Sequence, residues 1–420
     1  MADAPGARPE GRAWILTWLL SRAALLLCVL KVVTIPGPDV TSDVAVIYQG
    51  WSEVLRAGTY PVDDITWQYP PGAALALLSP ALLPFLAYPT AFFVLALLCD
   101  LLVLGMLRHA ERGGGGHRGT WMWIVGLPLL GPTAYARFDV MVTAVAVAAL
   151  LAGSTAGAVH RPRILGALAG FGALLKVWPL LLLVGTPRGR ATRRSWGAAA
   201  ATAGGLALLL WAAMPGALVF VTAQRDRGTE IESLGGTVLH VARHFGWQGQ
   251  VLLSYGSVEF IGPYVPLVSR IALGLTVAAA LWLAVWRLRA RRFGPGTVCD
   301  AAFAATLLFT VTSRVISPQY LLWLVGLAAV CLVHARSPMV LPARLVLTAT
   351  GVTLLEFPVW FAQVVASDPL GVLLLVLRNG LLVTAALIAC ARLWRRTVPA
   401  SRGRGSVTPA APEDSPATAR

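Results

Sequence analysis

The carboxylate of Asp43 stands at the start of a segment whose apolar residues recur at helical spacing. Those residues are Val44, Ile47, Tyr48, Trp51, Val54 and Leu55, and Gly58 follows them as a helix stop. We expect an amphipathic helix that lies on the outer membrane face. Asp43 can serve there as a helix N-cap, or as a catalytic base at the boundary between water and lipid. The two roles are compatible, because a capping carboxylate stays ionised.

Further ionisable residues stand at the outer ends of other apolar runs. They are Arg137, Asp139, Lys176, Arg225, Asp226, Arg227, Glu230, Glu232 and Arg314. Charges at a membrane boundary are costly and are candidates for function by default. Their recurrence on one face predicts that an anion is held there, because the guanidinium fork suits phosphate. The alternative is that ion pairs such as Arg137–Asp139 or Arg227–Glu232 fix the loops.

Other motifs favour structural roles. His240 and His244 are four residues apart, but no HExxH motif and no third ligand accompany them, so we expect no metal site there. Gly166 and Gly170 form a GxxxG motif, which favours close helix packing. The five cysteines show no CxxC spacing, which argues against a zinc site and against a disulfide framework.

The elements that must position these residues are membrane spans. Of the 420 residues, 57% are hydrophobic and only 13% are charged, whereas a soluble domain carries about 25% charged residues. The apolar residues form long runs, close to the ~20 residues that a helix needs to cross a bilayer. This pattern excludes an ordinary cytosolic enzyme and predicts an all-α polytopic membrane protein. In a membrane protein, the positions of the basic residues that give the net charge of +15 indicate which loops lie in the cytoplasm. We therefore expect no nucleic-acid partner.

Arginine-rich segments alternate with acidic segments along the chain. We place the basic segments in the cytoplasm, because arginine near the end of a span is poorly translocated; they are 1–13, 108–118, 159–163, 186–195, 287–299, 334–344 and the tail from 392. The intervening segments hold 11 of the 19 acidic residues and are placed outside; they are 36–71, 135–139, 215–265, 314–319 and 363–369. About ten spans result, near 14–35, 88–107, 120–134, 138–158, 197–214, 266–286, 300–313, 320–333, 344–362 and 371–391. Both termini are then cytoplasmic.

Two apolar stretches do not fit as simple spans. Residues 164–185 have basic loops at both ends and are interrupted at Lys176 and Pro179, which predicts a broken, re-entrant helix pair. Residues 72–84, bounded by prolines, predict a second short helix that dips into the membrane. The predicted organisation is a cytoplasmic segment at 1–13, one transmembrane domain at 14–391 with large first and middle outer loops, and a disordered cytoplasmic tail at 392–420.

The outer segments resemble the actinobacterial family-87 glycosyltransferases of the GT-C superfamily. The resemblance covers about residues 14–391, and no single motif in it is as specific as a zinc signature. The motifs that carry it are Asp43-Val-x-x-x-Tyr48-x-x-Trp51, Gly58-x-Tyr60-Pro61, Gln68-Tyr69-Pro70-Pro71-Gly72, Arg137-Phe138-Asp139, Lys176-x-x-Pro179, Arg227-Gly228-Thr229-Glu230-Ile231-Glu232-Ser233 and Ser317-Pro318-Gln319-Tyr320-x-x-Trp323.

This resemblance implies a fold of the GT-C type and an enzyme that transfers a hexose, typically mannose, from a polyprenyl-phosphate-sugar donor. The acceptor is a lipid or glycan, and the reaction takes place at the outer face of the cytoplasmic membrane. The acid of the first outer loop, here Asp43, is implied as the base of a single inverting displacement. The donor phosphate is assigned to Arg314, Arg227 and Lys176, and the sugar or acceptor to Tyr69, Gln68, Arg137, Asp139, Glu232, Gln319 and Tyr320. The scheme requires no cofactor and no metal, although Asp63 and Asp64 leave a metal open.

The alternative from another class is a non-enzymatic membrane carrier of a lipid-linked or anionic solute. The break between Lys176 and Pro179 would suit a carrier, because carriers bind substrate at broken helices near the bilayer midplane. The crowding of polar motifs at one surface, and the absence of a matching break in the other half of the chain, favour the enzyme.

Overall fold

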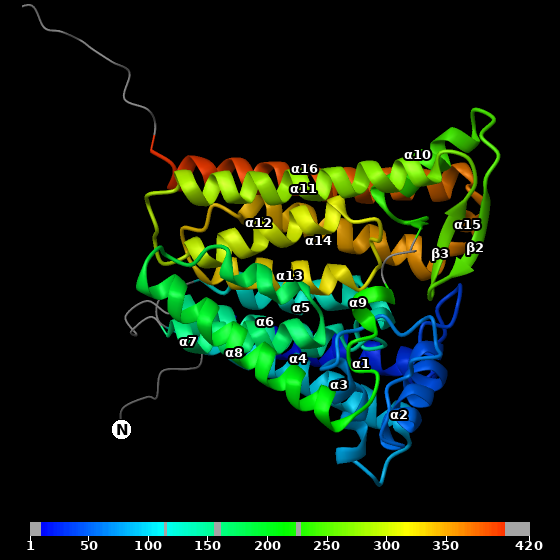
Figure 1. Ribbon diagram of the computed structural model, residues 1–420, viewed down its shortest axis with the longest axis horizontal. Helices are drawn as coiled ribbons and strands as arrows, with labels where there is room; N and C mark the ends of the chain where they lie inside the picture. Colours follow the sequence, from blue (N-terminus) through cyan, green and yellow to red (C-terminus); the bar gives the residue numbers. More distant parts are fainter. Residues whose placement is uncertain (1–9, 113–115, 155–160, 224–227, 400–420) are drawn as a thin grey trace, which may run out of the picture.

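The computed structural model describes residues 10–112, 116–154, 161–223 and 228–399, and consists of helices that run alongside one another with a small β-sheet at one end (Figure 1). The elements are α1 (Glu10–Val29), η1 (Asp43–Tyr48), α2 (Gln49–Arg56), α3 (Ala73–Leu78), η2 (Ser79–Leu82), α4 (Tyr88–Glu111), α5 (Arg118–Leu129), η3 (Gly131–Ala134), α6 (Asp139–Ser154), α7 (Pro162–Leu175), η4 (Trp178–Leu183), α8 (Arg190–Ala213), α9 (Phe220–Ala223), β1 (Thr229–Glu230), α10 (Leu234–Arg243), β2 (Gln250–Ser254), β3 (Ser257–Ile261), α11 (Val265–Arg289), α12 (Thr297–Thr312), α13 (Tyr320–Val333), α14 (Val340–Leu354), η5 (Leu355–Val359), α15 (Phe361–Ala366) and α16 (Pro369–Thr397).

Each predicted span coincides with a helix, namely α1, α4, α5, α6, α8, α11, α12, α13, α14 or α16. Within the described residues, five helices are long and apolar enough to cross a membrane by themselves, and shorter apolar helices accompany them. The expected class, an all-α polytopic membrane protein, is therefore confirmed. The helices α8 and α11 lie on the outside of the bundle, because only 6% and 0% of the residues in their most apolar stretches are buried. The helix α13, in contrast, is buried along nearly its whole length.

The ends of two predicted spans are wrong. The first helix stops at Val29 instead of continuing to residue 35, because Lys31 adopts a left-handed conformation with φ of 60°. The last helix continues to Thr397, so residues 392–397 of the predicted tail are helical. Residues 400–420, the rest of the predicted disordered tail, lie outside the described part of the chain.

The predicted break at Lys176 is present. The helix α7 ends at Leu175, Lys176 is extended, and the chain resumes as the short 3-10 helix η4. The GxxxG glycines serve the expected packing: a Cβ on Gly166 or Gly170 would lie 2.0 or 2.4 Å from a backbone oxygen of α8. The short helix predicted at residues 72–84 is present as α3 and η2.

The basic and acidic segments gather at opposite ends of the bundle. At one end, Arg287 donates to Thr192 Oγ1 of the 186–195 segment at 2.6 Å, and the Arg291 amide donates to the Thr397 carbonyl at 2.9 Å. At the other end, the Tyr60 amide donates to the Pro215 carbonyl at 3.1 Å, which joins the first and middle outer loops. Figure 1 shows α2, β2, β3 and α15 together at this second end.

The middle outer loop contains a three-stranded antiparallel sheet that the sequence analysis did not predict. Its strand order is β1-β3-β2, and Glu230 of β1 pairs with Glu259 of β3. The sheet and α10 enclose a small second core that includes Ile231, Leu239 and Phe260. This core gives the loop a defined shape above the membrane helices.

Candidate functional site

The predicted surface helix is formed by η1 and α2, which are continuous. Its buried apolar residues are Val44, Tyr48, Trp51 and Leu55, all of which belong to the apolar face that the periodicity predicts; Ile47 and Val54 of that face are partly buried. The Tyr48 ring packs against Phe92 of α4 and against Phe138, with ring centroids 5.7 and 5.9 Å apart. Gly58 has φ of +90° and ends the helix. These contacts fix η1, which begins at Asp43, against α4 and against the connection that contains Phe138.

The carboxylate of Asp43 forms an ion pair with Arg137, with 2.7 Å between Oδ2 and Nη2, and the Asp43 side chain is 34% exposed. Among the described residues, no helix-capping hydrogen bond involves this carboxylate, and the hydroxyl of Ser42 donates to the Asp39 carbonyl instead. The structure therefore does not support the N-cap interpretation. Asp43 combines a fixed orientation with access to solvent.

Arg137 is held in the short connection between η3 and α6. The preceding 3-10 helix η3 begins at Gly131, where the chain turns with φ of +64°. The guanidinium also donates to the carbonyls of Val40 and Ala136, at 3.1 and 2.8 Å. The alternative of an Arg137–Asp139 ion pair is wrong, because the two residues point their charges at different partners.

Asp139 is fully buried and pairs with Lys176, whose Nζ lies 2.7 and 2.9 Å from the two carboxylate oxygens. The indole Nε1 of Trp323 donates to the same carboxylate at 2.7 Å. The extended backbone at the break between α7 and η4 carries Lys176 into this position. One buried carboxylate thus ties the break to α6 and α13.

Aromatic rings surround the Lys176 ammonium. Its Nζ lies 4.9 Å from the Phe138 ring centroid and 5.4 Å from that of Tyr69. The Tyr69 and Phe138 rings meet edge to face at 5.1 Å. The Tyr320 ring stacks on Trp323 at 4.0 Å. The structure therefore brings together Tyr69, Tyr320 and both ion pairs.

Gln68 links the two outer loops. Its Nε2 donates to the Tyr255 carbonyl in the turn between β2 and β3 at 3.0 Å, and the residue is buried. The loop that contains Gln68 is stabilised further by Asp64, which accepts hydrogen bonds from Thr66 and Trp51. Burial alone would raise the pKa of Asp64, but these hydrogen bonds outweigh it and lower the pKa below the ordinary value. The Asp64 carboxylate is thus engaged in hydrogen bonds that stabilise this loop.

The segment from Ser313 to Gln319 is held by two buried charges. Glu230 accepts from the Ile316 amide at 2.6 Å and from the Ser317 hydroxyl at 3.1 Å. Arg378 of α16 donates to the Ile316 carbonyl at 3.2 Å. The segment carries Arg314, whose Nη1 donates to Ser269 Oγ at 3.4 Å, and it leads into α13 at Gln319. The positions of Arg314 and Gln319 therefore depend on Glu230 and Arg378.

Glu232 lies deeper than the sequence analysis implied. Its carboxyl group is buried beside Glu356, which pairs with Arg378 at 2.9 Å. Burial, and then the nearby charge of Glu356, raises the pKa of Glu232 well above the ordinary value. The arrangement supports the packing of the middle loop on α16. Arg227, the predicted partner of Glu232, lies outside the described residues.

Several buried charges that support the site were not singled out from the sequence. Arg378 and Glu356 lie inside predicted spans, as do Arg22 and Asp100, which pair at 2.8 Å. The Tyr135 hydroxyl donates to Asp100 at 2.6 Å and so anchors the connection that carries Arg137. Charge inside a predicted span is the signal that would have found all four.

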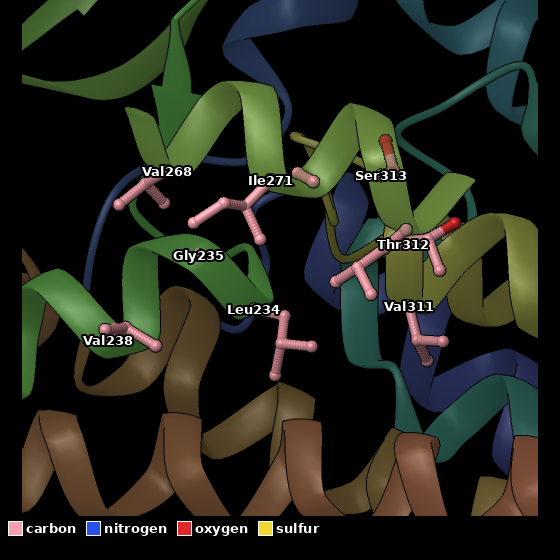
Figure 2. A pocket seen from close by; sticks show the side chains of 10 residues that line it. Leu234, Gly235, Val238, Val268, Ile271, Val311, Thr312 and Ser313 are labelled. Carbon is pink, nitrogen blue, oxygen red and sulfur yellow. The ribbon is translucent and has the colours of Figure 1, made fainter. Parts of the chain in front are cut away.

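An apolar cavity of about 180 Å³ lies between α10, α11 and the end of α12 (Figure 2). Figure 2 shows Leu234 and Val238 on one side, with Ile271 and Val311 among the other lining residues. Ser313, which precedes Arg314 in the sequence, is among the lining residues. His240 belongs to α10, one of the helices beside the cavity. Its two ring nitrogens form hydrogen bonds with the Ser367 hydroxyl at 2.7 Å and with the Ile231 carbonyl at 3.1 Å, which gives it a structural role.

Comparison with known proteins identifies one matching family. The model of glycosyltransferase family 87 matches residues 67–318, which agrees with the resemblance carried by the outer motifs. No curated protein sequence matches the chain significantly. Among solved structures, the chain is similar to ArnT from Cupriavidus metallidurans, determined in complex with undecaprenyl phosphate. The identity is 16%, the TM-score is 0.47, and the match covers 91% of this chain and 78% of that one.

Proposed function

Because the chain belongs to glycosyltransferase family 87, we propose that this membrane glycosyltransferase moves a hexose, with mannose as the first candidate, from a polyprenyl-phosphate-sugar donor to an acceptor hydroxyl. The acceptor is a lipid or a glycan at the outer face of the cytoplasmic membrane. We place both termini in the cytoplasm, as the basic segments of the sequence predict.

The observation that carries the proposal is the Asp43–Arg137 ion pair at the acidic end of the bundle. A base must be oriented and must still reach the acceptor, and Asp43 meets both conditions. In the proposed displacement, Asp43 takes the proton of the acceptor hydroxyl as its oxygen attacks the anomeric carbon. The bond between that carbon and the phosphate oxygen breaks, and polyprenyl phosphate leaves with both bonding electrons. Arg137 orients the carboxylate.

The leaving group requires a cation for its phosphate and an apolar site for its chain. Arg314 is the first candidate for the phosphate, because its guanidinium can form charge-assisted hydrogen bonds to phosphate oxygens. Ser313, the residue before Arg314 in the sequence, lines the apolar cavity, so we assign the isoprenoid chain of the donor to this cavity. Arg227 remains a candidate from the sequence motif.

The remaining predicted residues take different parts in the proposal. Tyr69, Tyr320 and Gln319 are the candidates for hydrogen bonds to the sugar or the acceptor. The charge of Lys176 is balanced by Asp139, so we assign this pair to positioning the aromatic rings and not to the phosphate. Gln68 and Glu232 hold the outer loops through the contacts described above.

The test compares the wild-type protein with Asp43→Asn in nanodiscs that contain polyprenyl-phosphate mannose and extracted envelope lipids. Release of polyprenyl phosphate is measured, and donor binding is measured separately. Removal of the base should lower turnover at least about 100-fold while donor binding and the thermal unfolding midpoint change little. Asp63→Asn is the matched control, because Asp63 is an exposed acid of the same outer segment and its loss should leave turnover unchanged.

Two outcomes would contradict the proposal. Equal release by the wild type and by Asp43→Asn would remove Asp43 from the chemistry. Donor binding without release, for mannose and for other hexose donors, would favour the membrane carrier, for which the Asp43 substitution should have no effect on transport.

A further inference from the structure

An open surface depression lies at the opposite end of the bundle from the proposed active site. Its volume is about 320 Å³, and it is lined by Pro338 and by Arg392, Arg395 and Arg396 of α16. The lining contains three guanidinium groups, which together carry fifteen N–H donors.

Few of these N–H donors form hydrogen bonds within the described part of the protein. Arg392 donates to the Pro338 carbonyl at 2.5 Å, and Arg396 donates to the Arg336 carbonyl at 3.0 Å. These bonds orient the two guanidinium groups, but a carbonyl oxygen does not neutralise their charge. Among the described residues, no carboxylate forms an ion pair with any of the three arginines, and the buried Asp300 acts on Arg396 only at longer range.

Arginines in the last turn of a helix often complement its exposed carbonyl groups. Here the Thr397 carbonyl already accepts hydrogen bonds from the backbone amides of Arg291 and Arg292, at 2.9 and 3.0 Å. The Thr397 hydroxyl in turn accepts from the Trp286 indole at 2.9 Å. The helix end is thus capped by the α11–α12 connection, and the guanidinium groups of α16 are available to a ligand.

The surroundings place the depression at the depth of the lipid head groups. Trp394 lies beside the arginines in sequence, and its ring is 6.2 Å from that of Trp282, a pairing typical of the membrane interface. Basic pockets at the cytoplasmic ends of spans bind phosphate-bearing lipid head groups. We propose that Arg392, Arg395 and Arg396 form a binding site for a phosphate group at the arginine-rich end of the bundle, separate from the site of sugar transfer.

The phosphate can come from an anionic phospholipid or from a soluble ion, and the experiment distinguishes these sources. Delipidated protein in a neutral detergent is titrated with phosphatidylglycerol, with phosphatidylcholine of the same chain length, and with sodium phosphate at constant ionic strength. Binding is measured by native mass spectrometry and by the shift of the thermal unfolding midpoint. A lipid source predicts binding of phosphatidylglycerol alone, whereas a soluble source predicts saturable binding of inorganic phosphate.

The triple variant Arg392→Gln, Arg395→Gln, Arg396→Gln should bind the anion at least about tenfold more weakly. The control is Arg190→Gln, Arg193→Gln, Arg194→Gln, which removes the same charge from the exposed start of α8 and should bind as the wild type does. The single variant Arg395→Gln breaks no internal hydrogen bond in the described structure, so it should weaken binding without lowering the unfolding midpoint of the ligand-free protein.

Equal loss of binding in the two triple variants would overturn the site, because it would indicate general surface charge. Equal binding of phosphatidylcholine and phosphatidylglycerol, without competition by phosphate, would also overturn it. None of these measurements depends on sugar transfer.

Discussion

The Arg137 guanidinium lies 2.7 Å from the Asp43 carboxylate and also donates to the Val40 carbonyl. The Arg137 side chain therefore joins the start of the outer helix, and the residues just before it, to the connection between two membrane helices. This connection is anchored in turn by the Tyr135 hydroxyl on buried Asp100. The orientation of Asp43 thus depends on contacts that continue into the membrane interior.

Replacement of Arg137 by Gln should lower kcat about ten- to 100-fold, because Asp43 loses its fixed orientation. Arg137→Lys should recover part of this loss by keeping the charge without the fork. Steady-state kinetics in nanodiscs would measure both effects. The control is Arg56→Gln, which removes an exposed charge from the same outer helix. Full activity in Arg137→Gln would show that the ion pair does not serve the reaction.

The buried Asp139–Lys176 pair should show strong coupling. Lys176→Met leaves a buried carboxylate that, among the described residues, keeps the hydrogen bond from the Trp323 indole, and should cost about 3–5 kcal/mol of stability. Asp139→Leu should be similarly destabilising, whereas the double variant should lose much less than the sum of the two. Unfolding of the four proteins in mixed micelles would measure the coupling. Simple additivity would mean that the two charges do not compensate one another.

Loss of the Glu230 charge should loosen the segment that carries Arg314. Glu230→Gln keeps the size of the side chain but weakens the bonds to the Ile316 amide and the Ser317 hydroxyl. We expect the KM for the donor to rise about tenfold with a smaller change in kcat, since the segment is proposed to hold the donor phosphate. Glu53→Gln, on the exposed face of α2, is the control. An unchanged KM would separate Glu230 from donor binding.

The stability of the outer loop should fall in acid because of His240. Burial lowers the pKa of His240 to about 4, below the ordinary value of about 6.5. The stabilising effect of the neutral ring is therefore complete above about pH 6.5 and is lost as the pH falls toward 4, by up to about 3 kcal/mol. Thermal unfolding between pH 8 and pH 4.5 would measure this slope.

The His240→Gln variant should be less stable at pH 8 and should show a flatter slope. His244→Gln, one helical turn away and exposed, should retain the wild-type slope. A wild-type slope in His240→Gln would place the acid sensitivity elsewhere in the chain.

The sequence by itself determined the membrane class, the order of the spans, the break at Lys176 and the outer helix from Asp43 to Gly58. These features depend on local patterns: long apolar runs, helical periodicity, and residues that stop a helix. The motifs also indicated the family. They placed most candidate residues at the same end of the bundle of spans. The three strands of the middle loop escaped prediction, because their short alternating pattern is stabilised by a small core to which α10, α11, α15 and α16 contribute residues.

The pairing of charges was decided only by the tertiary structure. The sequence offered Arg137–Asp139 as neighbours, yet Arg137 pairs with Asp43 and Asp139 with Lys176. Residues two apart at the start of a helix point in different directions, and the rotation and depth of each helix determine which distant partner a side chain meets. The same reason explains Arg378, which lies far from Glu230 in the sequence but holds the same residue, Ile316, from the other side.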